Sequence, residues 1–217
     1  MLLLGNIPAV FAAEDSGECG EGVTWKLADG VLTISGEGEM EDYDANGHTA
    51  PWHEAASTIT KIVIEKGVTY IGEGAFVGNN FRFFYIPKKV KKIRKNTFEN
   101  CENLQYIEFR SEELEEVECN AFSNCGFSEF VVPKCIKKMN SSSISKCKNL
   151  ENVVIESPNT KFEKEWLNDC KKLKFINYFG IPVYGNNMVF SYKNSLEFTK
   201  NLIEFIKTGN IDFNLNV

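Results

Sequence analysis

Cysteine is the residue whose spacing in this 217-residue chain most invites a chemical interpretation, because four of the seven cysteines recur at nearly equal intervals. Cys101, Cys125, Cys147 and Cys170 follow one another at intervals of 22 to 24 residues. A structural zinc site uses close Cys-x-x-Cys pairs or paired cysteine and histidine, and this spacing supplies neither. The odd number of cysteines also argues against a complete disulfide framework.

Nucleophilic and acid–base chemistry lack partners in this sequence. The chain has two histidines, His48 and His53, and both precede the cysteine series. A cysteine nucleophile needs a base within hydrogen-bonding reach, and the sequence contains no phosphate-binding loop and no metal-ligand set. We therefore expect a protein that is not an enzyme and that needs no cofactor.

The segment "DYDANG" carries oxygen ligands at a spacing that suits calcium. Asp42, Asp44 and Asn46 match the first half of a calcium-binding loop. The twelfth position of such a loop would be His53, whereas calcium loops place a bidentate glutamate there. The pattern therefore favours a polar turn, and these three residues remain a calcium candidate.

The basic run "KKVKKIRK", from Lys88 to Lys95, is typical of a nucleic-acid-binding patch. The corresponding positions of the next segment carry "EELEEVE", starting at Glu112, and lysines return at Lys134. If these segments stack, basic, acidic and basic rows lie side by side and cancel the patch. The formal net charge of −6 also disfavours nucleic acid, so no nucleic-acid partner is expected.

The elements that must position these residues form a repeat. From Ile59 onward the chain divides into units of 22 and then 23 residues with matching apolar columns. The columns are Ile59, Phe81, Leu104, Phe127, Leu150 and Leu173 at position 1; Ile62, Phe84, Ile107, Phe130, Val153 and Ile176 at position 4; and Ile64, Ile86, Phe109, Val132, Ile155 and Tyr178 at position 6. Positions 4 and 6 predict a strand with one buried face.

One unit is too small to bury its own apolar side, so the units are expected to stack into one continuous core. The predicted fold class is a β-rich solenoid of about six units over residues 59–180. In this register Cys101, Cys125, Cys147 and Cys170 share a column with Asn79, and both residue types can donate to turn carbonyls. The column is interpreted as a buried ladder, although rungs about 5 Å apart leave room for a strained disulfide between neighbours.

The repeat residues also carry a resemblance to a known family. The segments "VTYIGEGAF" and "YIPKKVKKIRKNTFENCENL" resemble the unit of the BspA-like leucine-rich-repeat family. The resemblance covers about residues 16–176 and weakens in later units, where "SSISKC" and "KEWLNDC" replace the Ala-Phe step. It implies a leucine-rich-repeat solenoid and adhesion, by binding to host proteins such as matrix components or to other cells.

The first residues predict export. The run "MLLLGNIPAVFAAED" resembles the end of a secretory signal peptide with cleavage near Ala12 or Ala13. No later run reaches the roughly 20 apolar residues that a membrane span needs, so membrane insertion is not expected. We therefore expect a secreted or cell-surface protein, with residues 1–13 as a signal-peptide remnant.

Both ends of the solenoid need a cap. Residues 14–58 are expected to form an N-terminal cap with a β-hairpin that turns at Asp29 and Gly30. Residues 181–217 are expected to form a C-terminal cap with a helix that begins at Asn194 or Ser195 and ends near Gly209.

The exposed strand positions are the candidate binding site. Positions 3 and 5 of the unit flank the buried columns, and they bring together Phe83, Tyr85 and Tyr106, with Arg82 and Arg110 nearby. Exposed aromatic residues beside arginine are typical of binding hot spots, although aromatic residues also favour ordinary strand surfaces.

The predicted function is a non-enzymatic adhesion module that binds a protein, such as a host matrix or cell-surface protein, through its exposed strand face. Two alternatives remain open. The repeats could form a structural spacer or envelope component without a specific ligand. They could also form a secreted effector that binds a protein inside a host.

Overall fold

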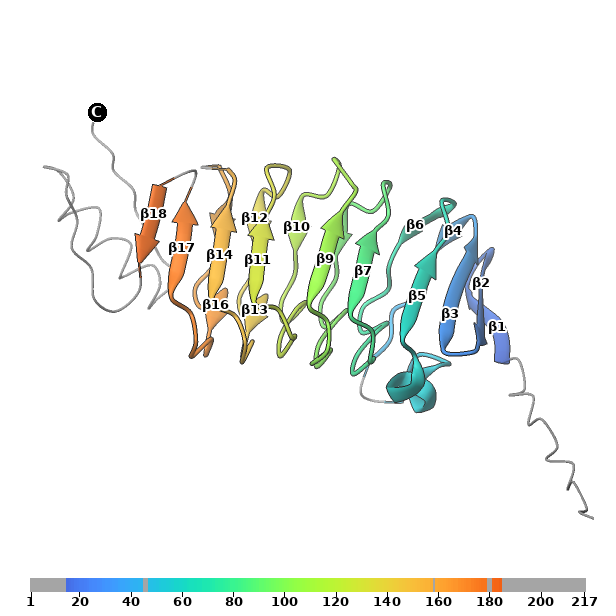
Figure 1. Cartoon of the computed structure of the whole chain (residues 1–217). Helices are drawn as coiled ribbons and strands as arrows, with labels where there is room; N and C mark the ends of the chain where they lie inside the picture. The colour runs from blue at the N-terminus through green and yellow to red at the C-terminus, as the bar shows by residue number, and fades with distance from the viewer. Residues whose placement is uncertain (1–14, 45–46, 158, 179–180, 185–217) are drawn as a thin grey trace, which may run out of the picture.

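The computed structural model describes residues 15–44, 47–157, 159–178 and 181–184, which form a β-solenoid with almost no helix (Figure 1). Successive turns of the chain, called rungs below, stack along one axis from β1 at one end to β18 at the other. Within the described residues, the single helix is the short 3-10 helix η1 (His53–Thr58), which leads into the first repeat strand.

One side of the solenoid, called the long-strand face, takes a four-residue strand from each rung. Its strands are β5 (Lys61–Ile64), β7 (Phe83–Ile86), β9 (Tyr106–Phe109), β11 (Glu129–Val132), β14 (Asn152–Ile155) and β17 (Phe175–Tyr178). In β7, Phe84 and Ile86 are buried while Phe83 and Tyr85 are exposed. This is the alternation predicted from the two-residue spacing of the apolar columns.

A second side, called the short-strand face, is built from strands of two or three residues. They are β6 (Val68–Tyr70), β8 (Lys92–Ile93), β10 (Glu116–Val117), β12 (Lys138–Met139) and β15 (Lys161–Phe162). Strands β8, β10, β12 and β15 form one parallel sheet. Its register places Lys92 beside Glu116 and Glu116 beside Lys138, so the charged residues form a row across the rungs.

The third side, called the turn face, consists of tight turns and of the short strands β13 (Ile144–Ser145) and β16 (Leu167–Asn168). Two columns of residues there have a left-handed backbone with φ between 54° and 69°. The columns are Gly74, Asn96, Asn120, Ser142 and Glu165, and Gly78, Asn100, Asn124, Lys146 and Asp169. Glycine and asparagine tolerate this conformation best, which explains their presence in the earlier rungs.

Backbone hydrogen bonds run from rung to rung along the turn face. The amide of Phe76 donates to the carbonyl of Thr97 at 2.9 Å, and the amide of Phe98 donates to that of Ala121 at 2.9 Å. The series continues through Phe122, whose amide donates to the carbonyl of Ser143 at 2.9 Å. These bonds satisfy backbone groups that the buried turns could not expose to water.

Stacked aromatic rings fill the core behind these faces. Trp52, Phe76, Phe98 and Phe122 follow one another with ring centroids 6.1, 5.6 and 5.3 Å apart. The rings of Phe98 and Phe122 are nearly parallel, at an interplanar angle of 1°. The repeat therefore places one large ring per rung, and each ring buries the face of the previous one.

The N-terminal strands are β1 (Asp15–Gly20), β2 (Val23–Ala28), β3 (Val31–Gly36) and β4 (Gly38–Glu39). Strands β2 and β3 pair antiparallel across Asp29 and Gly30, both with positive φ. Strand β3 then pairs in parallel with β5, so the sheet order is β1-β2-β3-β5. At the other end β18 (Ile181–Tyr184) pairs antiparallel with β17.

The long-strand ladder is interrupted twice within the described residues. Strand β5 ends one sheet, β7 and β9 pair only with each other, and β11 begins another sheet with β14, β17 and β18. We call the β5/β7 junction the first seam and the β9/β11 junction the second seam. At the first seam the short-strand face is also unpaired, because β6 pairs with β4 and β8 pairs with β10.

Three predicted features lie outside the described residues. They are the signal-peptide remnant at residues 1–13, the C-terminal helix expected between Asn194 and Gly209, and Asn46 of the calcium candidate.

Candidate binding surface

The residues proposed for binding lie on the two-stranded sheet between the seams. Strands β7 and β9 pair in parallel with Phe83 beside Tyr106 and Tyr85 beside Glu108. Phe83, Tyr85 and Tyr106, called the aromatic patch below, are 55%, 45% and 51% exposed. The rings of Phe83 and Tyr106 are in contact, with centroids 6.3 Å apart and tilted by 56°. This sheet therefore presents large apolar side chains to solvent.

Arg110 is held against the third ring of the patch. Its guanidinium carbon lies 4.0 Å from the centroid of the Tyr85 ring, a cation–π contact. Its Nε donates to Oε1 of Glu108 at 2.7 Å, and this ion pair raises the pKa of Arg110. The two contacts hold the guanidinium and the ring together, so this end of the patch is preorganised.

Arg82 lies at the entrance of β7 and plays a different part. Its carbonyl accepts hydrogen bonds from the amides of Gln105 and Tyr106 at 3.0 and 3.2 Å. Its side chain is exposed and forms no ion pair with any residue that the structure describes. The structure thus brings Phe83 to Tyr106 and Tyr85 to Arg110, and it leaves the Arg82 guanidinium open to solvent.

The cysteine column lies in the interior beside the turn face. Cys101, Cys125 and Cys147 are at most 3% exposed, and Cys170 is half-buried. Each buried thiol reaches back one rung to the carbonyl of a core residue. The bonds run from Cys101 to Phe76 at 3.0 Å, from Cys125 to Phe98 at 3.2 Å and from Cys147 to Phe122 at 3.3 Å.

Asn79 occupies the first position of this column and bonds differently. It is 2% exposed, and its Nδ2 donates to the carbonyl of Val77 in its own turn at 3.2 Å. Its Oδ1 is buried and has no hydrogen-bond partner among the described residues. Asparagine therefore fills the space of the column without joining the thiol series.

The buried thiols are poor nucleophiles because their charged form is disfavoured. Burial raises the pKa of Cys101 to about 12 and the pKa of Cys125 well above its usual value. A hydrogen bond with Cys170, together with burial, raises the pKa of Cys147 as well. Since the thiolate is the reactive form, the column favours packing and hydrogen bonding over catalysis.

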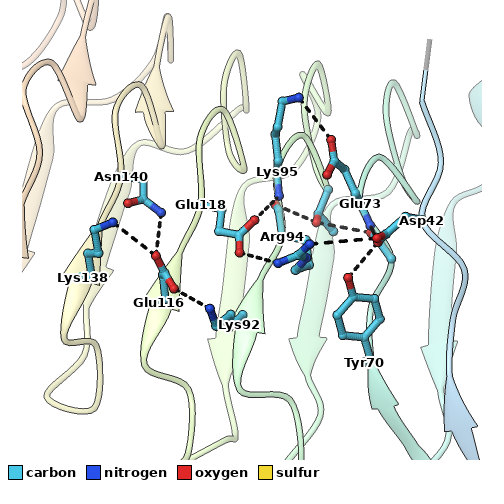
Figure 2. A network of polar contacts seen from close by, with 12 residues as sticks. Asp42, Tyr70, Glu73, Lys92, Arg94, Lys95, Glu116, Glu118, Lys138 and Asn140 are labelled. Atoms are coloured by element: carbon cyan, nitrogen blue, oxygen red, sulfur yellow. Dashed lines mark hydrogen bonds and ion pairs between the residues drawn. The ribbon is translucent and has the colours of Figure 1, made fainter. Parts of the chain in front are cut away.

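The short-strand face carries a continuous series of ion pairs. Lys92 and Lys138 lie 2.8 and 3.5 Å from the carboxylate of Glu116, and Lys138 also lies 2.8 Å from Glu163 (Figure 2 shows the part around Glu116). Burial opposes the ionisation of Glu116, but hydrogen bonds from Lys92 and Asn140 outweigh it and lower its pKa. The alternating charge rows of the sequence thus neutralise one another across the rungs.

Arg94 connects the strands on the two sides of the first seam on this face (Figure 2). Its Nη1 lies 2.6 Å from Oε1 of Glu118, its Nη2 lies 4.0 Å from Oδ2 of Asp42, and its guanidinium lies 5.5 Å from the Tyr70 ring. Burial opposes the charge on Arg94, but the carboxylates of Glu118 and Asp42 help to outweigh it and raise its pKa. Side chains thus connect β6 with β8 where the backbone ladder is missing.

Asp42 of the calcium candidate is part of this network. Its Oδ1 accepts hydrogen bonds from the hydroxyl of Tyr70 at 2.8 Å and from the amide of Glu73 at 2.7 Å. Among the described residues no group of three or more histidine, cysteine or acidic side chains is placed to hold a metal ion. Asp44 lies in the same segment, and its amide donates to the carbonyl of His48 at 2.9 Å.

The part of the chain that the structure describes contains no helix long and apolar enough to cross a membrane. A repeat fold can serve many functions, and the function depends on the residues that the repeats display.

Sequence reasoning missed two features of these surfaces. The Asp42–Tyr70–Arg94 contact joins a residue outside the repeat register to two rungs, and no periodicity could indicate it. The left-handed turn columns did leave a signal, because Asn100 and Asn124 immediately precede cysteines of the column.

Comparison with known proteins adds a family match. A family model described as the BspA type leucine rich repeat region matches residues 69–197 in six copies, which is more than half of the chain. The sequence pattern predicts about six units, over residues 59–180. A search of curated proteins finds no match.

Two solved structures share the fold. A leucine-rich repeat protein from Eubacterium ventriosum superposes with a TM-score of 0.54 at 24% identity, covering 69% of this chain and 46% of that one. One from Bacteroides ovatus gives a TM-score of 0.51 at 20% identity, covering 64% of this chain and 37% of that one. The chain therefore spans less than half the length of either structure, and at these identities the likeness concerns the fold.

Proposed function

The chain belongs to the BspA-type leucine-rich repeat family, and from that premise we propose that it is a non-enzymatic module that binds another protein through its long-strand face. The exposure of Phe83, Tyr85 and Tyr106 on one two-stranded sheet is the observation that carries this proposal. Aromatic residues supply large contact area at low entropic cost and are enriched in interface hot spots.

The surroundings of the patch support a recognition role. Each of the three rings costs free energy when exposed, yet none of them closes the core, which Phe84, Ile86 and Leu104 fill from beneath. Arg110 is already ordered against Tyr85 and Glu108, so less conformational entropy is lost when a partner binds. These properties favour a surface that binds a partner over an ordinary exposed strand surface.

The proposed setting is the cell surface or the extracellular space. The signal-peptide-like sequence of residues 1–13 and the adhesion function implied by the family resemblance support it. The proposed partner is a matrix or cell-surface protein of a host. The domain division that we propose with this function is an N-terminal cap over residues 14–58, repeats over residues 59–180 and a C-terminal cap over residues 181–217.

The test is binding to a panel of immobilised, purified extracellular-matrix proteins, measured by surface plasmon resonance. The variant Phe83→Ala/Tyr85→Ala/Tyr106→Ala should lower the affinity for the bound member at least tenfold, because truncation of one hot-spot residue costs about 2 kcal/mol or more. The matched control is Phe175→Ala, since Phe175 is 43% exposed in the same column of the last long strand.

The control should bind as the wild type does. Equal affinity of the wild type and the triple variant for every bound panel member would refute the patch as the binding surface. Binding to no panel member would favour the spacer, or an effector whose target lies elsewhere.

A further inference from the structure

The surroundings of the aromatic patch differ in charge from the protein as a whole. The chain has a formal net charge of −6. The strand edges of the first two rungs nevertheless carry five exposed cations, called the cationic rim below. They are Lys61 and Lys66 at β5, and Arg82, Lys88 and Lys89 at the two ends of β7.

The cations of the rim have no ion-pair partner among the described residues. Some lysines elsewhere are matched across rungs, as for Lys137 and Glu115 at 2.5 Å and for Lys174 and Glu151 at 2.8 Å. No rim residue forms an ion pair with any residue in the described ranges. Placing like charges at each end of these two strands without partners costs electrostatic free energy that a bound anion would recover.

Acidic side chains near the patch do not cancel the rim. Glu108 is neutralised by Arg110 at 2.7 Å, and Glu113 is paired with Lys91 at 3.5 Å. Glu65 and Glu112 are the exposed carboxylates without an ion pair on the described rungs of β5, β7 and β9. On these three rungs, five exposed cations without an ion pair among the described residues therefore outnumber two such carboxylates, and Glu129 of β11 adds a third beyond the second seam.

Resting on the proposed function, we propose that the partner contacts this site through an acidic segment in which aspartate or glutamate flanks aromatic or aliphatic side chains. The apolar side chains pack on Phe83 and Tyr106, and a carboxylate pairs with the open guanidinium of Arg82. Arginine binds carboxylates in a bidentate manner, which fixes orientation as well as charge. The unpaired lysines accelerate the encounter with an acidic partner.

A protein segment fits better than a long polyanion. Beyond the rim lie Glu112, Glu113 and Glu115, and the nearby Lys91 and Lys137 are already paired with Glu113 and Glu115. An extended nucleic acid or sulfated glycan would lie against these carboxylates, whereas a short segment contacts the rim and the patch alone. The exposed rings also require apolar partners, which a peptide supplies.

The experiment starts from random 12-residue peptides displayed on phage. Peptides are selected on the wild-type chain and depleted on Phe83→Ala/Tyr85→Ala/Tyr106→Ala. The surviving peptides should be enriched in Asp and Glu together with aromatic or aliphatic residues. An enriched peptide is then measured by fluorescence polarisation at low and high salt, with heparin and duplex DNA as competitors.

Three rim charges are removed in Arg82→Gln/Lys88→Gln/Lys89→Gln. The matched control Lys134→Gln/Lys161→Gln/Lys171→Gln removes three exposed charges that are unpaired within the described chain, away from the patch. The rim variant should weaken peptide binding at least tenfold at low salt and the control less than twofold. High salt should reduce the difference.

The outcomes separate the two proposals. Patch-dependent peptides without acidic enrichment, or equal effects of the rim and control variants, would overturn the acidic partner and leave the patch as a binding surface. Heparin or DNA could also displace the peptide and bind with an affinity that depends on the rim but not on the aromatic patch. That result would overturn the acidic protein segment in favour of a polyanion. A selection that yields no patch-dependent peptide would contradict both proposals.

Discussion

The long-strand face and the short-strand face are built from the same repeats, but they are stabilised in different ways. On the short-strand face a parallel sheet runs unbroken from β8 to β15, and charged side chains pair from rung to rung. On the long-strand face the ladder is interrupted at two seams, and the sheet between them displays Phe83, Tyr85 and Tyr106. On the short-strand face the charged side chains pair with one another. On the long-strand face the aromatic side chains are exposed and available to a partner.

The difference indicates how a repeat protein can separate stability from recognition. A residue that pairs with the next rung adds to the nearest-neighbour terms that hold a solenoid together. A residue that points outward without a partner adds little to stability and is free to vary. Substitutions on the two faces should therefore affect different measurements, and the predictions below test that separation.

The largest effect is expected where the two faces share a core. Phe98 is fully buried and stacks between Phe76 and Phe122 behind both faces. Phe98→Ala should lower the free energy of unfolding by about 3 to 5 kcal/mol, since it removes a large ring and leaves a cavity. Urea unfolding followed by circular dichroism measures the change. A loss below about 1 kcal/mol would show that the stack does not couple the rungs.

Arg94→Met should give the next largest effect and should affect stability alone. The variant keeps the apolar stem but removes the hydrogen bond to Glu118 and the contact with Asp42. We expect a loss of about 1.5 to 3 kcal/mol, the range for a hydrogen bond to a charged group. Hydrogen exchange should also quicken in β6 and β8, because the first seam has no backbone ladder there.

Lys91→Met is the control for that prediction. Lys91 lies on the same strand edge, its side chain is 71% exposed, and its ion pair with Glu113 is 3.5 Å long. Its replacement should change stability by less than about 0.5 kcal/mol. Equal losses in the two variants would show that Arg94 does not act as a specific connection across the seam.

Glu116→Gln tests the ion-pair series through the pH dependence of the free energy of unfolding. The pKa of Glu116 is lowered in the folded protein, so the stability it contributes is present above its unfolded pKa and is lost as pH falls through the folded value. Glu163, whose pKa is lowered by Lys138, acts in the same direction. The variant should be less stable than the wild type near neutral pH, and the difference should shrink as pH falls below about 4.3, the usual pKa of a glutamate in an unfolded chain.

Urea unfolding at several pH values measures this difference. A difference in stability that stays constant from neutral pH to about pH 3 would mean that Glu116 contributes through packing and neutral hydrogen bonds. It would refute a contribution of the ion pairs to the stability of the short-strand face.

Much of the fold could be predicted because burial repeats with a fixed period. Phe84 and Ile86 are two residues apart and buried, while Phe83 and Tyr85 beside them are exposed, as strand geometry requires. The repeat register also located the cysteine column in the interior, although it did not indicate that each thiol bonds to the carbonyl of the preceding rung.

The seams and the Arg94 network could not be predicted because they depend on contacts outside the repeat register. Ile107 and Phe109 fit the apolar columns as well as Phe130 and Val132 do, yet β9 and β11 do not pair. The sequence favours a polar turn around Asp42 and leaves calcium binding as the weaker candidate, because the neighbouring residues supply oxygen atoms. Its place beside Tyr70 and Arg94 comes from the path of the chain between β4 and η1.

Apart from the Lys91 control, the smallest effect on stability is expected from the aromatic patch itself. Phe83, Tyr85 and Tyr106 make few buried contacts, so the triple alanine variant should keep its unfolding free energy within about 1 kcal/mol of the wild type. The loss should come mainly from the contact between Phe83 and Tyr106, because aromatic cross-strand pairs contribute roughly 0.2 to 1 kcal/mol. Urea unfolding of the variant measures this value.

A loss comparable to that of Phe98→Ala would mean that the rings hold the two-stranded sheet together. Their role would then be in folding rather than in recognition. A near-zero loss, combined with a tenfold or larger loss of binding, would show that stability and recognition reside on different faces of the same repeats.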